Sequence, residues 1–159
     1  MKISGQNLRG HVRLLKPLFA LIFIVWLLRL LLYAAGSPQW LVTSASVTVT
    51  LAACVLLATA LIHVRKFGGY TNVVLATVLL VAWTQLLIVG AIEFSVITGT
   101  NNIFSAPEYS FPGHDPSHLK HILGHLTFGL GFGTLIGAAV GCLLLFLLRL
   151  ILPNSQQRA

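Results

Sequence analysis

The stretch LTFGLGFGTLIGAAVGCLLLFLLRLIL, residues 126–152, decides the fold class of this chain. Its one charged residue is Arg149, close to its end, and Pro153 follows directly. A helix needs about 20 apolar residues to cross the roughly 30 Å hydrocarbon core of a bilayer. We therefore predict that residues 126–152 form a membrane-spanning helix.

Three further apolar runs precede this stretch, at residues 17–35, 40–63 and 71–98. Across the chain 57% of the residues are hydrophobic and 8% are charged, whereas a soluble domain carries about 25% charged residues. The predicted fold class is all-α: a polytopic transmembrane four-helix bundle in which residues 1–159 form a single membrane domain. The first run is longer than the roughly 7–15 apolar residues of a secretory signal, so we interpret it as a retained span.

Lysine and arginine are distributed unevenly around the four predicted spans, and this predicts the orientation of the chain. With Arg29 set aside as intramembrane, eight lie on one side: Lys2, Arg9, Arg13, Lys16, Arg65, Lys66, Arg149 and Arg158. Only Lys120 lies on the other side. By the positive-inside rule both termini are cytoplasmic, and the one long polar loop, residues 99–125, is outside. We expect a plasma membrane, which in a bacterium is the inner membrane. Basic residues this scattered do not form a nucleic-acid-binding face.

The acidic residues and most of the histidines gather between residues 93 and 125, at the end of span three and in the loop that follows it. This stretch holds all three acids and four of the six histidines: Glu93, Glu108, His114, Asp115, His118, His121 and His125. Aspartate followed by proline is typical of a helix start, so we predict that a helix begins at Asp115-Pro116. In such a helix His118, His121 and His125 share one face.

This histidine face is a candidate metal site. His121 and His125 have the four-residue spacing that lets two imidazoles reach one metal ion. The candidate ligands are His118, His121, His125, Glu93 and His114, with Glu108 or Asp115 as a base. The metal could be zinc, copper or iron. Ile122 follows His121, so the H-E-x-x-H signature of zinc peptidases is absent. In the alternative interpretation the histidines are solvated side chains in the headgroup zone and bind no metal.

Arg29 and Glu93 are charged residues inside apolar runs, several residues from the outer ends of the first and third spans. Because a charge is costly inside a membrane, such residues usually find a partner. We predict an ion pair between Arg29 and Glu93. In a functional interpretation Glu93 is a metal ligand or a proton acceptor. In a structural interpretation the pair only fixes the register of the two helices. In a third interpretation Arg29 extends its side chain to the outer interface.

Glycines recur every four residues in the fourth span, at Gly129, Gly133, Gly137 and Gly141. Glycine lets a second helix approach closely, which is how many membrane helices pack. We therefore predict that this glycine series is a helix-packing face. The partner could be another span of the same chain or a second copy.

The chain contains neither a nucleophile elbow nor a phosphate-binding glycine loop, so no specific reaction is indicated. Three functions remain open. The first is an accessory or assembly subunit of a membrane complex, which the small size and the glycine series favour. The second is a metal-dependent membrane enzyme or metal-handling protein that uses His118, His121 and His125. The third is proton-coupled transport built on Arg29 and Glu93. The expected partners are the lipid bilayer and, through span four, other membrane subunits or a homo-oligomer; nucleic acid is not expected.

Overall fold

The computed structural model describes residues 2–3, 6–105 and 118–152 of the chain. Two short strands, β1 (Lys2–Ile3) and β2 (Gln6–Asn7), pair antiparallel ahead of the first helix. The remaining elements are helical: α1 (Leu8–Ala34), α2 (Gln39–Ser44), α3 (Val47–Val64), α4 (Tyr70–Thr98), α5 (Leu119–Gly124), the π-helical turn η2 (His125–Gly129) and α6 (Leu130–Ile151). The chain is thus almost entirely α-helical over the described residues, as predicted.

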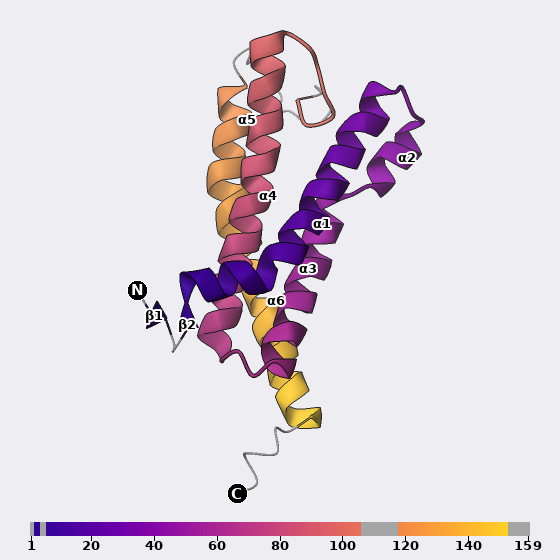
Figure 1. Ribbon diagram of the computed structural model, residues 1–159. Helices are drawn as coiled ribbons and strands as arrows, with labels where there is room; N and C mark the ends of the chain where they lie inside the picture. The colour runs from indigo at the N-terminus through magenta and orange to yellow at the C-terminus, as the bar shows by residue number, and fades with distance from the viewer. Residues whose placement is uncertain (1, 4–5, 106–117, 153–159) are drawn as a thin grey trace, which may run out of the picture.

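Four helical segments are long and apolar enough to cross a membrane: Leu8–Ala34, Gln39–Val64, Tyr70–Thr98 and Leu119–Ile151. By length and composition the chain is therefore an integral membrane protein. This confirms the prediction of four spans. Figure 1 shows the four segments gathered into one bundle.

The first span begins earlier than the sequence predicted, because α1 starts at Leu8 rather than near residue 17. The side chain of Asn7 caps this helix, and its Oδ1 accepts a hydrogen bond from the backbone N–H of Gly10 at 2.8 Å. Figure 1 shows α1 starting across the bundle and then turning to run along it. Pro17 lies inside the helix and lacks a backbone N–H, which is a common cause of such a bend.

The second span is broken into α2 and α3 at Ala45 and Ser46, where the sequence predicted one continuous helix. Hydroxyl side chains at the break hydrogen-bond to the backbone. Ser44 Oγ donates to the carbonyl of Leu41 at 2.7 Å. Ser46 caps α3 by accepting from the N–H of Val49 at 3.3 Å. Such local bonds compete with the helical ladder, so they stabilise a helix end inside an apolar run.

The fourth span begins at Leu119, although residues up to 125 were predicted to be loop. The residue before it, His118, has a left-handed backbone with φ of 52° and serves as the N-cap of α5. The helix therefore starts after His118, and His121 and His125 belong to the span itself. The predicted start at Asp115-Pro116 lies outside the described residues.

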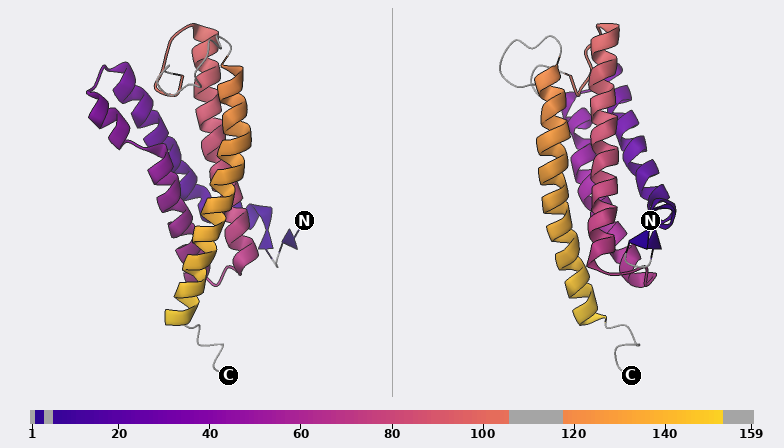
Figure 2. Two further views of the ribbon diagram at one scale, coloured as in Figure 1. Left: turned by 180° about the vertical axis from the view of Figure 1, so that it is seen from behind. Right: turned by 90° about the vertical axis from the view of Figure 1, so that its left-hand side faces the viewer.

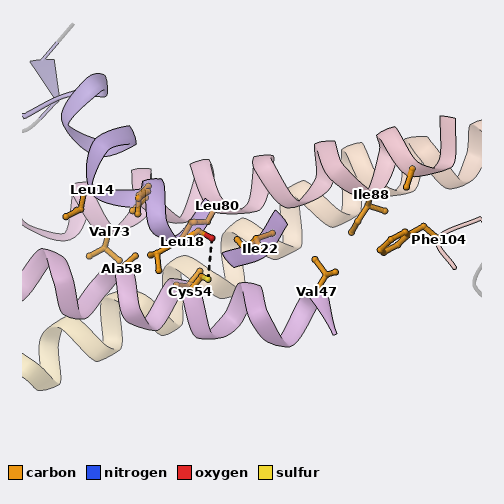
Figure 3. Packing of buried hydrophobic residues seen from close by; sticks show 14 of the residues in the cluster. Leu14, Leu18, Ile22, Val47, Cys54, Ala58, Val73, Leu80, Ile88 and Phe104 are labelled. Carbon is orange, nitrogen blue, oxygen red and sulfur yellow. Dashed lines mark hydrogen bonds between the residues drawn. The ribbon is translucent and has the colours of Figure 1, made fainter. Parts of the chain in front are cut away.

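The central helix of the bundle is α4, which packs against α1, α3 and α6. Leu18 and Ile22 of α1, Cys54 and Ala58 of α3 and Leu80 of α4 meet in the apolar core (Figure 3). Within it the thiol of Cys54 lies 3.9 Å from the carbonyl oxygen of Leu18. This core positions α1, α3 and α4 relative to one another.

The glycine series of the fourth span lies against other helices of the same chain. A Cβ placed on Gly133 would lie 3.1 Å from Val81 of α4, and one placed on Gly137 would lie 2.8 Å from Thr77. A Cβ on Gly141 would lie 2.8 Å from Val73 of α4 and 3.0 Å from Thr59 of α3. These contacts set the register of α6 against α4.

The two ends of the bundle differ in character. The histidine end is where α1 and α4 finish and α5 begins, and the basic end holds the α3–α4 connection and the end of α6 (Figures 1 and 2). At the basic end the guanidinium of Arg149 lies 4.9 Å from the ring centre of Tyr70 and donates to the carbonyl of Gly68 at 3.4 Å. This contact joins the end of α6 to the start of α4.

Candidate functional site

A polar cluster connects α4 to the fourth span near the histidine end. His121 lies on α5, His125 begins the π-helical turn η2, and Gln85 lies on α4. His121 is 8% exposed and Gln85 is 9% exposed, so both are buried among otherwise apolar helices. A π-helical turn inside an α-helix is rare and frequently occurs at functional sites.

The three side chains form a continuous chain of close contacts. Nδ1 of His125 lies 2.9 Å from Oε1 of Gln85, and Nε2 of His125 lies 3.1 Å from Nε2 of His121. The two imidazole rings have centroids 5.0 Å apart and planes 31° apart. We call Gln85, His125 and His121 the histidine relay.

Gly129 makes room for this arrangement. A Cβ at Gly129 would lie between 2.8 and 2.9 Å from the amide atoms of Gln85. Any larger residue would therefore displace the Gln85 side chain from its place beside His125. Gly129 thus belongs to the glycine series and also leaves room for the Gln85 side chain of the histidine relay.

The contact with Gln85 fixes which nitrogen of His125 carries a hydrogen. With Oε1 of Gln85 as the acceptor, Nδ1 of His125 is the donor, and the lone pair of its Nε2 faces His121. In the described part of the chain, Nδ1 of His121 is buried and has no hydrogen-bond partner. The same holds for Nδ1 of His118.

Two ring nitrogens this close can share one hydrogen or hold one metal ion. Zinc–imidazole bonds are about 2.0–2.1 Å long, so nitrogens 3.1 Å apart would subtend about 100° at the ion, close to a tetrahedral angle. The relay therefore contains two imidazole nitrogens that could act as metal ligands and a hydrogen-bond acceptor that orients one of the rings.

Among the described residues, neither His118 nor Glu93 makes a hydrogen bond to His121 or His125. His118 is the N-cap of α5 and has a left-handed backbone, so it lies at the end of the helix rather than inside it. Glu93 is exposed on α4. Among residues 2–3, 6–105 and 118–152, no group of three or more histidine, cysteine or acidic side chains is placed to hold a metal. His114, Glu108 and Asp115 lie outside the described residues.

Arg29 and Glu93 have different surroundings. The guanidinium of Arg29 lies over the ring of Phe104, 5.4 Å from its centre, in the loop that follows α4. Glu93 is exposed on α4. The ion pair stays a prediction.

Gln85 was not among the predicted site residues. The signal was present: Gln85 is a lone amide in the middle of the apolar run 71–98. A polar side chain in such a position usually has a partner on another helix. The sequence did not identify this partner, because the partner depends on the register of α6 against α4.

The comparison with known proteins gives no match: no family model fits the chain, and no curated protein or solved structure is significantly similar to it.

Proposed function

We propose that this chain is a small integral membrane protein that binds one divalent transition-metal ion, such as Zn²⁺, between the imidazoles of His121 and His125. In this role it handles a metal at the membrane, alone or as an accessory component of an assembly. The observation that carries the proposal is the 3.1 Å separation of the two Nε2 atoms.

Gln85 supports a metal role for His125. A metal-bound histidine almost always donates its second ring N–H to an oxygen, which fixes the tautomer and the orientation of the ring. Oε1 of Gln85 occupies that position at Nδ1 of His125, at 2.9 Å.

The proposed orientation follows from the charges. Arg65, Lys66 and Arg149 lie at the basic end of the bundle, so the positive-inside rule assigns that end to the cytoplasm. The histidine relay then lies toward the non-cytoplasmic side. A metal ion would reach it from that side without crossing the apolar core.

The two competing functions have weaker support. A subunit that assembles through the glycine series would need that face free, but Gly133, Gly137 and Gly141 lie against α3 and α4. Proton-coupled transport was predicted from a pairing of Arg29 with Glu93, and Glu93 is exposed.

The experiment is a titration of metal-free protein in detergent with Zn²⁺ by calorimetry and with Co²⁺ by absorption spectroscopy. We expect one ion per chain in the wild type and, in His121→Ala and in His125→Ala, a loss of affinity of about tenfold or more. His63→Ala is the matched control, because His63 is a buried histidine near the basic end of α3. It should bind metal like the wild type.

Circular dichroism of each variant shows whether the fold survives. If the wild type binds neither ion, or if folded His121→Ala and His125→Ala bind as well as His63→Ala, the proposal is wrong. The pair would then be a hydrogen bond between two turns of a helix.

A further inference from the structure

A second feature of the histidine end lies on the opposite side of α4 from the relay. Toward this end α1 and α2 diverge from α4 and α5, as Figure 1 and the left view of Figure 2 show. A partly open cavity of about 880 Å³ lies between α1, α4 and the loop after α4. This volume is within the range of pockets that bind small molecules.

The walls of the cavity are apolar. Leu27, Leu30 and Leu31 line it from α1, and Leu86 and Phe94 line it from α4. Among the described residues that line the cavity, none carries a charge. Since both walls belong to candidate membrane spans, a molecule that enters from the side comes from the lipid phase.

Gly90 keeps the α4 wall open. A Cβ placed on Gly90 would meet no heavy atom within 4 Å, although Gly90 lines the cavity. A larger side chain at this position would extend into the cavity without striking a neighbouring helix. Gly90 is therefore a suitable position for a substitution that fills the cavity.

The far end of the cavity is polar and firmly built. Asn102 is held in place because its Nδ2 donates to the carbonyl of Ala91 at 2.7 Å and its Oδ1 accepts from the N–H of Phe104 at 2.9 Å. Ser95 Oγ lies 2.7 Å from Ser105 Oγ and fixes the same loop to α4. The loop is thus a structured cap over one end of the cavity.

Two polar side chains in this lining have hydrogen-bonding capacity to spare. In residues 6–105 and 118–152, the hydroxyl of Tyr33 and the amide of Asn101 make no hydrogen bond, and both residues line the cavity. Both groups are neutral and can donate as well as accept. They suit an uncharged head group that carries hydroxyl or carbonyl oxygens.

From this arrangement we propose that the cavity binds a single-chain lipid with an uncharged, hydrogen-bonding head group. The chain lies between α1 and α4, against Leu30 and Gly90. The head group lies at the capped end, beside Tyr33 and Asn101. This site is separate from the histidine relay and does not depend on a metal.

The test uses monoolein as the probe and oleate as its charged counterpart, added to detergent-purified protein and counted by native mass spectrometry. We expect the wild type to retain one monoolein. Gly90→Leu should reduce retention at least about tenfold, because the new side chain occupies the chain site. Gly131→Leu is the matched control, since Gly131 is a helical glycine outside the cavity lining whose Cβ would also meet nothing within 4 Å.

Tyr33→Phe and Asn101→Ala should each weaken monoolein binding severalfold while the variants stay folded. If Gly90→Leu does not fold, Leu30→Phe fills the cavity from the opposite wall and replaces it. The proposal is overturned if a folded, cavity-filled variant retains as much monoolein as Gly131→Leu. It is also overturned if oleate binds more tightly than monoolein, because the head group would then be charged.

Discussion

Glycines have opposite effects at the two faces of α4. Glycines of the fourth span allow close packing on one face, and Gly90 leaves space on the other. On the face toward α6, side chains of α4 crowd the positions that a Cβ would take on four glycines of the fourth span: Gly129, Gly133, Gly137 and Gly141. Toward α1, the corresponding space at Gly90 is empty and forms part of a cavity. The same residue type thus closes one helix interface and opens the other.

The comparison shows what a glycine pattern can and cannot indicate. A four-residue repeat favours close packing, because successive glycines stay on nearly one side of a helix. Gly131 lies outside the repeat, and its Cβ would meet nothing within 4 Å. Regular spacing, rather than the number of glycines, therefore marks the packed face of the fourth span.

Alanine substitution at a packed glycine and at an open glycine of α6 should give the largest difference between the two kinds of position. In Gly141→Ala the new Cβ would lie 2.8 Å from Val73 and 3.0 Å from Thr59. Valine has a stiff side chain, so the helices must separate, and we expect a loss of about 1–3 kcal/mol in the free energy of unfolding. In Gly131→Ala we expect no loss, and a gain of up to about 1 kcal/mol from helix propensity.

Denaturation of both variants in mixed micelles measures these free energies. Equal effects at the two positions would contradict the packing of Gly141 against α3 and α4. The difference between the two variants is the informative quantity, since both add one methyl group to the same helix.

The relay gives the next largest expected effect. Gln85→Leu keeps a side chain of similar size but removes the acceptor for Nδ1–H of His125, so the ring is no longer held in one orientation. Loss of such an oxygen typically costs 10–100-fold in metal affinity, and we expect about that loss for Zn²⁺.

Thr84→Val is the control for this substitution. Thr84 is buried next to Gln85, and its hydroxyl bonds only to the carbonyl of Leu80 in its own helix among the described residues. Calorimetric titration with Zn²⁺ should show the wild-type affinity for Thr84→Val. An unchanged affinity in Gln85→Leu would mean that Gln85 does not orient the metal ligands.

The sequence predicted the existence of the four spans well, because hydrophobicity alone determines which segments leave water. It predicted their ends poorly. Hydropathy does not detect the hydrogen bond of Ser46 that starts α3 inside an apolar run, nor the left-handed His118 that sets the start of α5. Both depend on the geometry of single residues.

Prediction of the candidate sites was limited in a similar way. The proximity of His121 and His125 follows from local helical spacing and was predicted. The side chain of Gln85 reaches His125 only because α6 packs against α4 in one register, and Gly129 permits this register. The cavity beside Gly90 depends on the divergence of two whole helices, and no local pattern indicates such a divergence.

The smallest expected effect concerns the closed half of the α1–α4 interface, which borders the cavity. There the indole N–H of Trp83 donates to the carbonyl of Phe19 at 3.1 Å. Trp83→Phe removes this bond between two spans, which in membrane proteins contributes about 0.6 kcal/mol on average. We expect a loss of that size, together with a small packing cost.

Trp40→Phe is the control, because Trp40 is 71% exposed and its loss should leave the free energy of unfolding nearly unchanged. Monoolein retention should stay at the wild-type level in both variants, since neither tryptophan lines the cavity. If Trp83→Phe instead abolished retention, the closed half of the interface would control the width of the open half. The two halves would then act as one hinge between α1 and α4, and the cavity would depend on the hydrogen bond to Phe19 as much as on Gly90.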